Sequence, residues 1–356
     1  MQKKVIVAAL AAAFAMPVSA LADDAALMFY GKINVDVESV KSDKVANTAA
    51  DASSLNRVQS NASRFGFKGS ETLGGGLKTV YQFEAQIDSV NNSNGTPFNG
   101  VRNSQLGLQG GFGTIFAGNW DSPYKVAHNK IELFDNTTVF TTNALVGVTG
   151  NGKNYVTRQR NVIEYMSPNM GGLSVQAAYS MDSSKTATTN KTTTSVAGMY
   201  ENDMLYAALA YETRSDQTTV GKSDNATRLV AALKFPNGLI GATLERMSVA
   251  NTASTTASQT NSELVGMYSI GMTSLGIAYA KDGDYNGVSN TGANQLSLRY
   301  GYNFTKATEL YAAYTSVSNG NATAIYGFNA SAATVAPTRG VGAKQTGLGL
   351  GLIHSF

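Results

Sequence analysis

The chain of 356 residues contains no cysteine, only two histidines and six prolines, and little excess charge. Without cysteine, neither disulfides nor thiol chemistry contributes. The two isolated histidines, His128 and His354, form neither a zinc site nor a Ser-His pair, so we expect no cofactor, no metal and no enzymatic activity. With 27 basic and 24 acidic side chains, the near balance of charge gives no reason to expect a nucleic acid partner.

One short segment resembles the opening of a calcium-binding loop. Asp282, Asp284, Asn286 and Gly287 match the pattern, but Ala293 stands where a bidentate glutamate is expected. We therefore interpret the segment as a solvated loop.

The N-terminus is predicted to be a signal peptide. Lys3 and Lys4 form a basic start, residues 5–18 form an alanine-rich apolar run, and residues 20–22 (Ala-Leu-Ala) are typical of a cleavage site. The apolar run is shorter than the roughly 20 residues that a membrane-spanning helix needs, and Pro17 interrupts its end. We expect residues 1–22 to be removed and residues 23–356 to form one domain.

The remaining sequence lacks any apolar run of membrane-helix length, but its side chains alternate as they do in strands. From Leu27 to Val37 every second residue is apolar or small, whereas Lys32, Asn34 and Asp36 occupy positions between them. Similar runs of about ten residues, the length of a tilted membrane strand, recur at 77–88, 228–235 and 295–304. A soluble β-sandwich would alternate in the same way, so the period alone leaves both folds open.

The lengths of the connections favour a membrane barrel. Tight turns are predicted at residues 74–76, 110–113, 167–169, 202–203, 236–238, 271–273 and 306–307. Long polar connections are predicted at residues 42–61, 121–157, 182–194, 216–225, 251–261, 282–294 and 318–344. Such alternation is typical of transmembrane barrels with short periplasmic turns and long outer loops. We therefore predict an all-β fold, an antiparallel transmembrane β-barrel of about 16 strands.

The last predicted strand carries a separate signal. Leu348, Leu350, Leu352, His354 and Phe356 share one face, and an aromatic residue at the end of the strand suits the interfacial girdle of a barrel. The pattern resembles the outer-membrane assembly signal, so we expect the barrel-assembly machinery to recognise Leu352, His354 and Phe356.

Three longer motifs resemble one family. They are SRFGFKG at 63–69, GLQGGFGTIFAGN at 107–119 and RQRNVIEYMSPNMGGLSVQAAYS at 158–180. Together they are similar to the neisserial-type general porins of Gram-negative bacteria. The resemblance implies a homotrimer of 16-stranded barrels in the outer membrane, surrounded by lipid and lipopolysaccharide, with the third outer loop (residues 121–157) folded into the pore.

Such a barrel would be a water-filled channel for passive diffusion of small polar solutes and ions. Two alternatives remain open at the level of sequence. One is a solute-selective channel with a binding track in its lumen, and the other is a plugged structural or adhesive barrel.

Residue parity indicates which charges line the pore. If Phe65, Phe67, Ile163 and Tyr165 face outward, their neighbours face the lumen. The basic residues predicted at the constriction are Lys32, Arg64, Lys68, Arg158 and Arg160; the third loop adds Glu132 and Asp135; and Asn119 stands where the family commonly has a basic residue. Opposed charges across a constriction select solutes by size and charge. We expect a weak preference for anions.

Overall fold

The computed structural model describes residues 26–44, 53–88, 90, 98–134, 138–251, 255–328 and 339–356. The predicted signal peptide and Asp135 lie outside these residues. Within the described part of the chain, no helix has the length and apolar character needed to cross a membrane.

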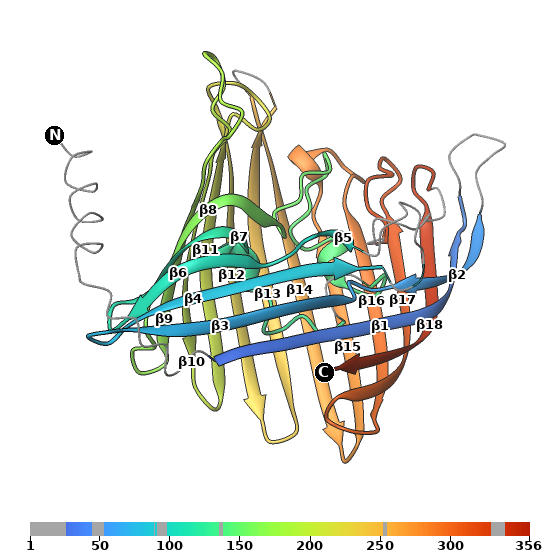
Figure 1. Ribbon diagram of the computed structural model, residues 1–356. Coiled ribbons are helices and arrows are strands. Elements are labelled where there is room, and N and C mark those ends of the chain that lie inside the picture. The colour runs from blue at the N-terminus through green and yellow to red at the C-terminus, as the bar shows by residue number, and fades with distance from the viewer. Residues whose placement is uncertain are drawn as a thin grey trace.

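The fold is a closed antiparallel β-barrel (Figure 1). Eighteen strand segments form one sheet. They are β1 (Ala26–Ser42), β2 (Ser54–Ser60), β3 (Arg64–Gly74), β4 (Leu77–Ile87), β5 (Phe98–Val101), β6 (Ser104–Gly110), β7 (Gly113–Asp121), β8 (Arg158–Met166), β9 (Leu173–Ser180), β10 (Thr193–Glu201), β11 (Leu205–Ser215), β12 (Ser223–Phe235), β13 (Gly238–Ala250), β14 (Thr256–Ile270), β15 (Thr273–Asp282), β16 (Ala293–Asn303), β17 (Thr308–Asn319) and β18 (Lys344–Ser355). The barrel closes because residues 32–42 of β1 pair with residues 345–355 of β18.

The eighteen segments make a wall of 16 strands, as predicted. β2 and β3 both pair with β1, so together they are one wall strand, interrupted around Ala62, whose φ is +45°. β5 and β6 both pair with β4 and form a second interrupted strand. Two wall strands are therefore each counted as two segments.

The alternation of side chains decides between a membrane barrel and a soluble sandwich. On β1, Ile33 and Val37 are exposed, whereas Asn34, Asp36 and Glu38 are buried. The apolar face therefore points away from the barrel and the polar face points into it, which is the arrangement of a barrel in lipid. The predicted apolar and polar faces are confirmed. The apolar face points outward and the polar face inward, the opposite of a soluble protein.

The predicted tight turns are all present between consecutive strands, but three long connections are shorter than predicted. β12 begins at Ser223, within the loop predicted at 216–225. Residues 54–60 belong to β2, and β14 begins at Thr256 within the loop predicted at 251–261. These polar segments extend strands because their inward side chains are buried, as Gln259 and Asn261 are. Polar composition therefore does not mark a loop where the strand rises above the apolar belt.

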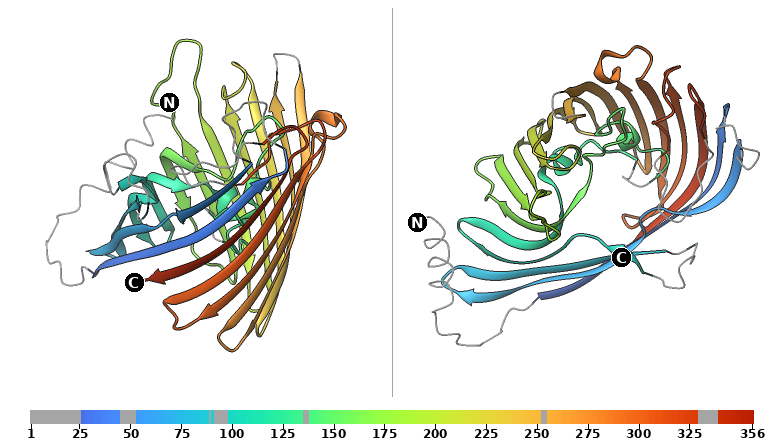
Figure 2. Two further views of the ribbon diagram at one scale, coloured as in Figure 1. Left: turned by 90° about the vertical axis from the view of Figure 1, so that its right-hand side faces the viewer. Right: turned by 90° about the horizontal axis from the view of Figure 1, so that it is seen from above.

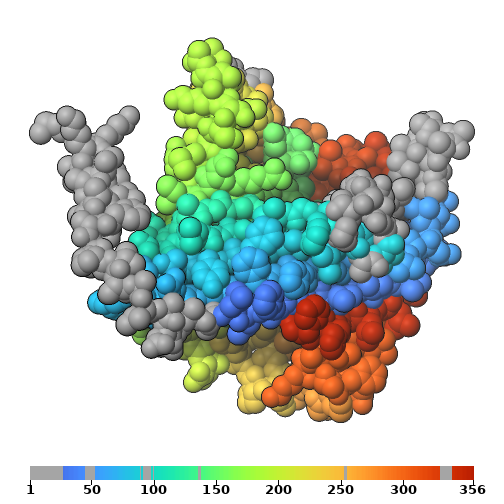
Figure 3. Space-filling view, viewed as in Figure 1, coloured from blue at the N-terminus to red at the C-terminus, as the bar shows by residue number. Residues whose placement is uncertain are grey.

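The two sides of the barrel differ in strand inclination. β1, β3 and β4 cross the front of the molecule at a shallow slope, whereas β12 to β14 stand nearly upright behind them (Figure 1). This front wall forms a continuous band in the space-filling view (Figure 3). Seen from above, the green chain between β7 and β8 lies inside the ring of strands (Figure 2). That segment positions the candidate site.

Candidate pore constriction

The segment between β7 and β8, residues 122–157, is the third loop, and it begins with a short capped helix. Ser122 precedes α2 (Pro123–Val126) and accepts a hydrogen bond from the backbone N–H of Lys125. Proline at the first helical position suits this start, because its missing N–H would have no partner there. A second short helix, η1 (Thr142–Ala144), lies on the returning limb of the loop.

A buried cluster fastens the start of the third loop to the inner wall. The Arg228 guanidinium donates to Oε2 of Glu245 at 2.7 Å, and the Tyr124 hydroxyl donates to the same oxygen at 2.9 Å. The guanidinium also lies over the Tyr124 ring, 4.2 Å from its centroid. Both charged side chains have no solvent exposure, so they hold the loop and do not face the pore.

The middle of the loop is held by Glu263 on β14. His128 Nε2 lies 2.6 Å from Oε2 of Glu263, and the Thr142 hydroxyl donates to the other carboxylate oxygen. Glu132 joins the loop to itself, since it accepts from the Thr141 hydroxyl at 2.8 Å and from the Asn143 amide at 2.7 Å. Burial raises the pKa of Glu132, with His128 opposing that effect.

The loop reaches the far side of the ring at Val139 and Phe140. A β-carbon at Gly349 on β18 would lie 2.7 Å from the Phe140 ring, and one at Gly347 would lie 3.5 Å from Val139. The two glycines therefore let the loop approach the wall closely. The third loop thus covers the inner wall from β10 round to β18.

The inner wall formed by β1 to β8 carries the basic cluster, which we define as Lys32, Arg64, Arg102, Lys125 and Arg158. Lys32 and Arg64 are direct cross-strand partners, so their side chains share a face. Lys125 joins the cluster from α2, through Asp121. The charges of these residues act on one another, and Glu84 and Asp121 lie among them.

Glu84 organises one half of the cluster. Its carboxylate accepts from Nε of Arg102 at 2.5 Å, from the Tyr30 hydroxyl at 3.0 Å, and lies 3.8 Å from Nε of Arg64. The Arg102 backbone N–H also donates to the Glu84 carbonyl. Arg102 lies in the interruption between β5 and β6, which lets its side chain turn toward the lumen face.

Asp121 organises the other half. Its Oδ1 lies 2.8 Å from Nζ of Lys125 and 3.2 Å from the Arg158 guanidinium, which also donates to Asn103. Burial lowers the pKa of Lys125, and the Asp121 carboxylate opposes that effect. Three arginines therefore surround two carboxylates, with Lys125 bound to Asp121, and the surplus charge is positive.

Two arginines of this cluster are more exposed than its acids. The side chains of Arg64 and Arg158 are 27% and 19% exposed, whereas Glu84 and Asp121 are 10% and 13% exposed. Arg64 and Arg158 are therefore the charged side chains of this cluster that are most accessible to solvent.

The other predicted constriction residues have different positions. The Lys68 ammonium lies 5.5 Å from the centroid of the Tyr30 ring, at the edge of the cluster. Asn119 donates to the carbonyls of Val101 and Arg102, so it supports the interruption between β5 and β6. Arg160 is exposed. It lies in a β-bulge beside Asn161, whose φ is +49°.

Two residues of the basic cluster, Arg102 and Lys125, were not predicted from the sequence. Period-two parity places a residue only within an uninterrupted strand, and Arg102 lies where the strand is interrupted. Lys125 left a signal, because Ser122-Pro123 is a typical helix start that would place Lys125 one turn after Asp121.

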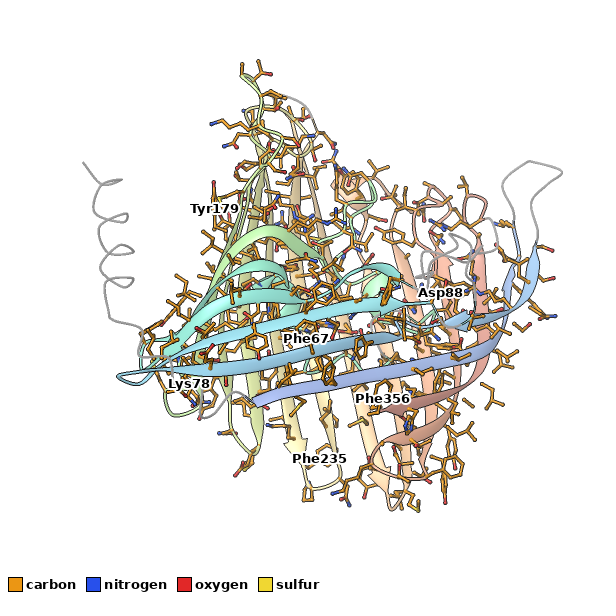
Figure 4. All side chains as sticks on the ribbon, in the orientation of Figure 1. Phe67, Lys78, Asp88, Tyr179, Phe235 and Phe356 are labelled. Carbon is orange, nitrogen blue, oxygen red and sulfur yellow. The ribbon has the colours of Figure 1, made fainter. Side chains whose placement is uncertain are left out.

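The predicted assembly residues lie at the seam where the barrel closes. Phe356 and Gly31 exchange two backbone hydrogen bonds, of 2.9 and 3.1 Å, and the Phe356 ring covers Gly31. His354 stacks on Phe356 and contacts the Thr308 hydroxyl, while Leu352 faces outward. Figure 4 shows Phe356 beside β1 and β18, on the same front side as Phe67, with Phe235 at the lower end of the upright strands. Within the described residues, no three Asp, Glu or His side chains gather as a metal site would require.

Comparison with known proteins gives consistent results. A family model described as Gram-negative porin matches residues 7–323. Outer membrane porin protein 32 of Delftia acidovorans is 28% identical over 377 aligned positions that cover all of both chains. Major outer membrane protein P.IB of Neisseria gonorrhoeae is 33% identical over 184 residues, covering 50% of this chain and 48% of the relative.

Solved structures share the fold. The anion-selective porin from Comamonas acidovorans has a TM-score of 0.78 at 24% identity, covering 94% of this chain and 100% of that one. OmpT of Vibrio cholerae has a TM-score of 0.68 at 15% identity, covering 96% and 100%. The chain therefore belongs to the Gram-negative porin family, and its barrel is an outer-membrane channel for passive diffusion of small hydrophilic solutes and ions.

Proposed function

We propose that this porin prefers anions and that Arg64, Arg102 and Arg158 carry the preference. The observation behind the proposal is the surplus of cations over carboxylates on the inner wall formed by β1 to β8, where Arg64 and Arg158 are more exposed than Glu84 and Asp121. Glu132, one of the acids predicted to oppose them, contributes less, because it is tied to the loop by hydrogen bonds. The description of the similar Comamonas porin as anion-selective agrees in sign.

Reversal potentials across a bilayer in a potassium chloride gradient test this proposal. Replacing Arg64, Arg102 and Arg158 with glutamine leaves Glu84 without its cation partners and Asp121 with Lys125 alone. The preference should then move toward cations. The matched control is Lys306→Gln, which removes one positive charge from an exposed periplasmic turn and should change nothing. A wild-type pore that favours cations contradicts the proposal.

The same bilayer assay separates nonspecific diffusion from a solute-selective track. A nearly ohmic conductance that millimolar sugars or organic acids leave unchanged supports nonspecific diffusion. Saturable block by one class of solute supports the selective channel.

The homotrimer is the second part of the proposal. The outer face of β1 offers a stripe of aliphatic residues at Ile33, Val35 and Val37, while Gly31, predicted to belong to it, lies under the Phe356 ring. Beside it, aromatic rings form a ladder across β1, β3 and β4, with the centroids of Phe29 and Phe65 separated by 6.2 Å and those of Phe67 and Phe83 by 5.8 Å. Unboiled protein in mild detergent should migrate as a trimer that heat dissociates, and a monomer under all conditions contradicts the assignment.

Assembly is the third part. We assign Leu352, His354 and Phe356 as the segment that the barrel-assembly machinery recognises, because this segment forms the closing seam with β1. Phe356→Ala should reduce the yield of heat-modifiable barrel in the outer membrane. Leu264→Ala removes an exposed, apolar, outward side chain from β14, away from the seam, and is the control, with a yield close to that of the wild type.

A further inference from the structure

A row of polar side chains crosses the outer face of the barrel near the long outer loops. Its members are consecutive cross-strand partners on β15 to β18, and we call them the outer polar row: Lys281, Asn294, Ser318 and Lys344. In each of these strands the residues directly before and after the row member are buried. Because successive side chains of a strand point to opposite faces, the row points away from the lumen.

The outer polar row lies just above the apolar belt, toward the upper ends of β15 to β18 in Figure 1. Four positions further down the same face, another set of consecutive partners is Ile277, Leu298, Tyr314 and Leu348. Ile277, Leu298 and Leu348 are exposed although they are apolar, as side chains that face lipid are. The row is therefore at the level of the lipid head groups of the outer leaflet.

Three glycines form a hollow directly above the row. Gly283, Gly292 and Gly320 each stand two positions beyond a member of the row, toward the outer loops. A β-carbon at any of them would collide with a backbone oxygen of a neighbouring segment, so no side chain can fill this surface. The result is a groove of about 350 Å³, lined by these glycines and by the first three members of the row.

The two lysines of the row have no acidic partner within the described part of the chain. On the lumen face, by contrast, Arg57 and Arg228 each lie 2.7 Å from a carboxylate oxygen. The acids that border the row, Asp43 and Asp284, accept hydrogen bonds from backbone N–H groups. The ammonium groups of the row are therefore available to an anion from outside the chain.

We propose that the outer polar row and the glycine hollow above it bind the phosphorylated disaccharide of one lipopolysaccharide molecule. Lys281 and Lys344 are three strand spacings apart, about 14 Å, so each can hold one of the two phosphates at the ends of the disaccharide. Between them, the Asn294 amide and the Ser318 hydroxyl can donate to and accept from sugar hydroxyls. The acyl chains lie against the apolar residues below the row.

The chemistry of the groove favours lipopolysaccharide over a phospholipid. A phospholipid such as phosphatidylglycerol has one phosphate and no sugar ring, so it would leave one lysine and the polar groove without a partner. The long loops also place the row in the outer leaflet, where lipopolysaccharide is found. The inference rests on the outer-membrane location of the barrel and is independent of the proposed preference for anions, because the row faces lipid and the basic cluster faces the lumen.

Titration of the refolded, lipid-free barrel in detergent with bisphosphoryl lipid A tests the proposal, with bound lipid counted by native mass spectrometry. The double variant Lys281→Gln/Lys344→Gln should bind about 30-fold more weakly than wild type, roughly fivefold for each lysine. Both side chains are exposed, so the variant should fold. The matched control is Lys185→Gln/Lys191→Gln, which removes the same charge from an exposed outer loop and should keep the wild-type affinity.

A second lipid tests the assignment of one phosphate to each lysine. Monophosphoryl lipid A should bind wild type more weakly than bisphosphoryl lipid A, and one of the single variants Lys281→Gln and Lys344→Gln should abolish that difference, because the lysine and the phosphate form one contact. Equal affinity of the two double variants for bisphosphoryl lipid A, or no binding by wild type, overturns the site. Equal binding of phosphatidylglycerol and lipid A by wild type overturns the choice of lipid.

Discussion

The inner wall of this barrel has two halves that use arginine differently. Under the third loop, Arg228 is fully buried and bound to Glu245 and Tyr124. The half formed by β1 to β8 is not covered by the third loop. There, Arg64 and Arg158 lie beside Glu84 and Asp121, and their side chains are partly exposed. The residue type and the inward parity are the same, but only the uncovered arginines meet a passing ion.

The difference shows that inward charge alone does not determine selectivity. A buried charge that is paired with a carboxylate, such as Arg228, helps to hold the loop in position. It has little effect on a passing ion, because the carboxylate cancels most of its field. In a wet pore, the field of an exposed charge decays over about 8 Å at physiological salt. Counting inward charges along the wall therefore overestimates the basic character of the pore.

The largest expected effect comes from removing the buried Arg228–Glu245 ion pair under the third loop. Arg228→Ala leaves the Glu245 carboxylate buried without its cation, which should lower the free energy of unfolding by about 3 to 5 kcal/mol. Urea titration of the folded barrel, followed by the fluorescence of Trp120 at the root of the loop, measures the loss. Arg246→Ala is the matched control, because Arg246 is exposed on the neighbouring strand. An equal loss in both variants would remove the distinction between the two kinds of arginine.

The second prediction concerns the tip of the loop. Gly349→Leu should collide with Phe140 and cost about 1 to 3 kcal/mol of stability through overpacking. It should also displace the loop tip and change single-channel conductance. Gly198→Leu points into open space and should do neither. Adding Phe140→Ala to Gly349→Leu should restore part of the loss, and strict additivity in the double-mutant cycle would count against this contact.

The sequence predicts the barrel well because its signals are local. Alternation along β1, turn residues such as Gly74 to Gly76 and the outward Leu348, Leu350 and Leu352 each depend on a few consecutive residues. Strand pairing then follows from turn length, since neighbouring strands joined by tight turns must pair. The number of wall strands required no long-range information.

The site is less predictable because it depends on the path of the third loop. Nothing local in the sequence indicates that Arg228 lies under Tyr124 or that His128 meets Glu263, which is 135 residues away. Likewise, Arg102 enters the basic cluster only because a strand is interrupted beside it. Arg228 and Arg158 both lie on the inner face of the barrel, but the loop gives them different surroundings.

The third prediction tests how Glu84 affects the basic cluster on the uncovered half of the wall. Glu84→Gln removes a negative charge from beneath Arg64 and Arg102 and should strengthen the preference for anions. A unit charge about 8 Å from the ion's path in water contributes about 0.5 kcal/mol, so the permeability ratio should change about twofold. Reversal potentials measure it. The control is Glu309→Gln, which removes the carboxylate paired with Arg299, a residue outside the basic cluster. This variant should shift the reversal potential less. An equal or larger shift in Glu309→Gln would place the selective region near Arg299.

The smallest expected effect distinguishes two arginines that parity treats alike. Arg158→Gln removes a cation in contact with Asp121 and should move the reversal potential toward cations by up to about twofold in permeability ratio. Arg160→Gln should have a smaller effect, because Arg160 is exposed at a bulge and its charge is screened by salt. Raising the ionic strength should therefore reduce the effect of Arg160→Gln before that of Arg158→Gln. A larger shift for Arg160→Gln at every salt concentration would show that the narrowest part of the pore lies at the bulge, and that Arg158 serves mainly to hold Asp121 and Asn103 in place.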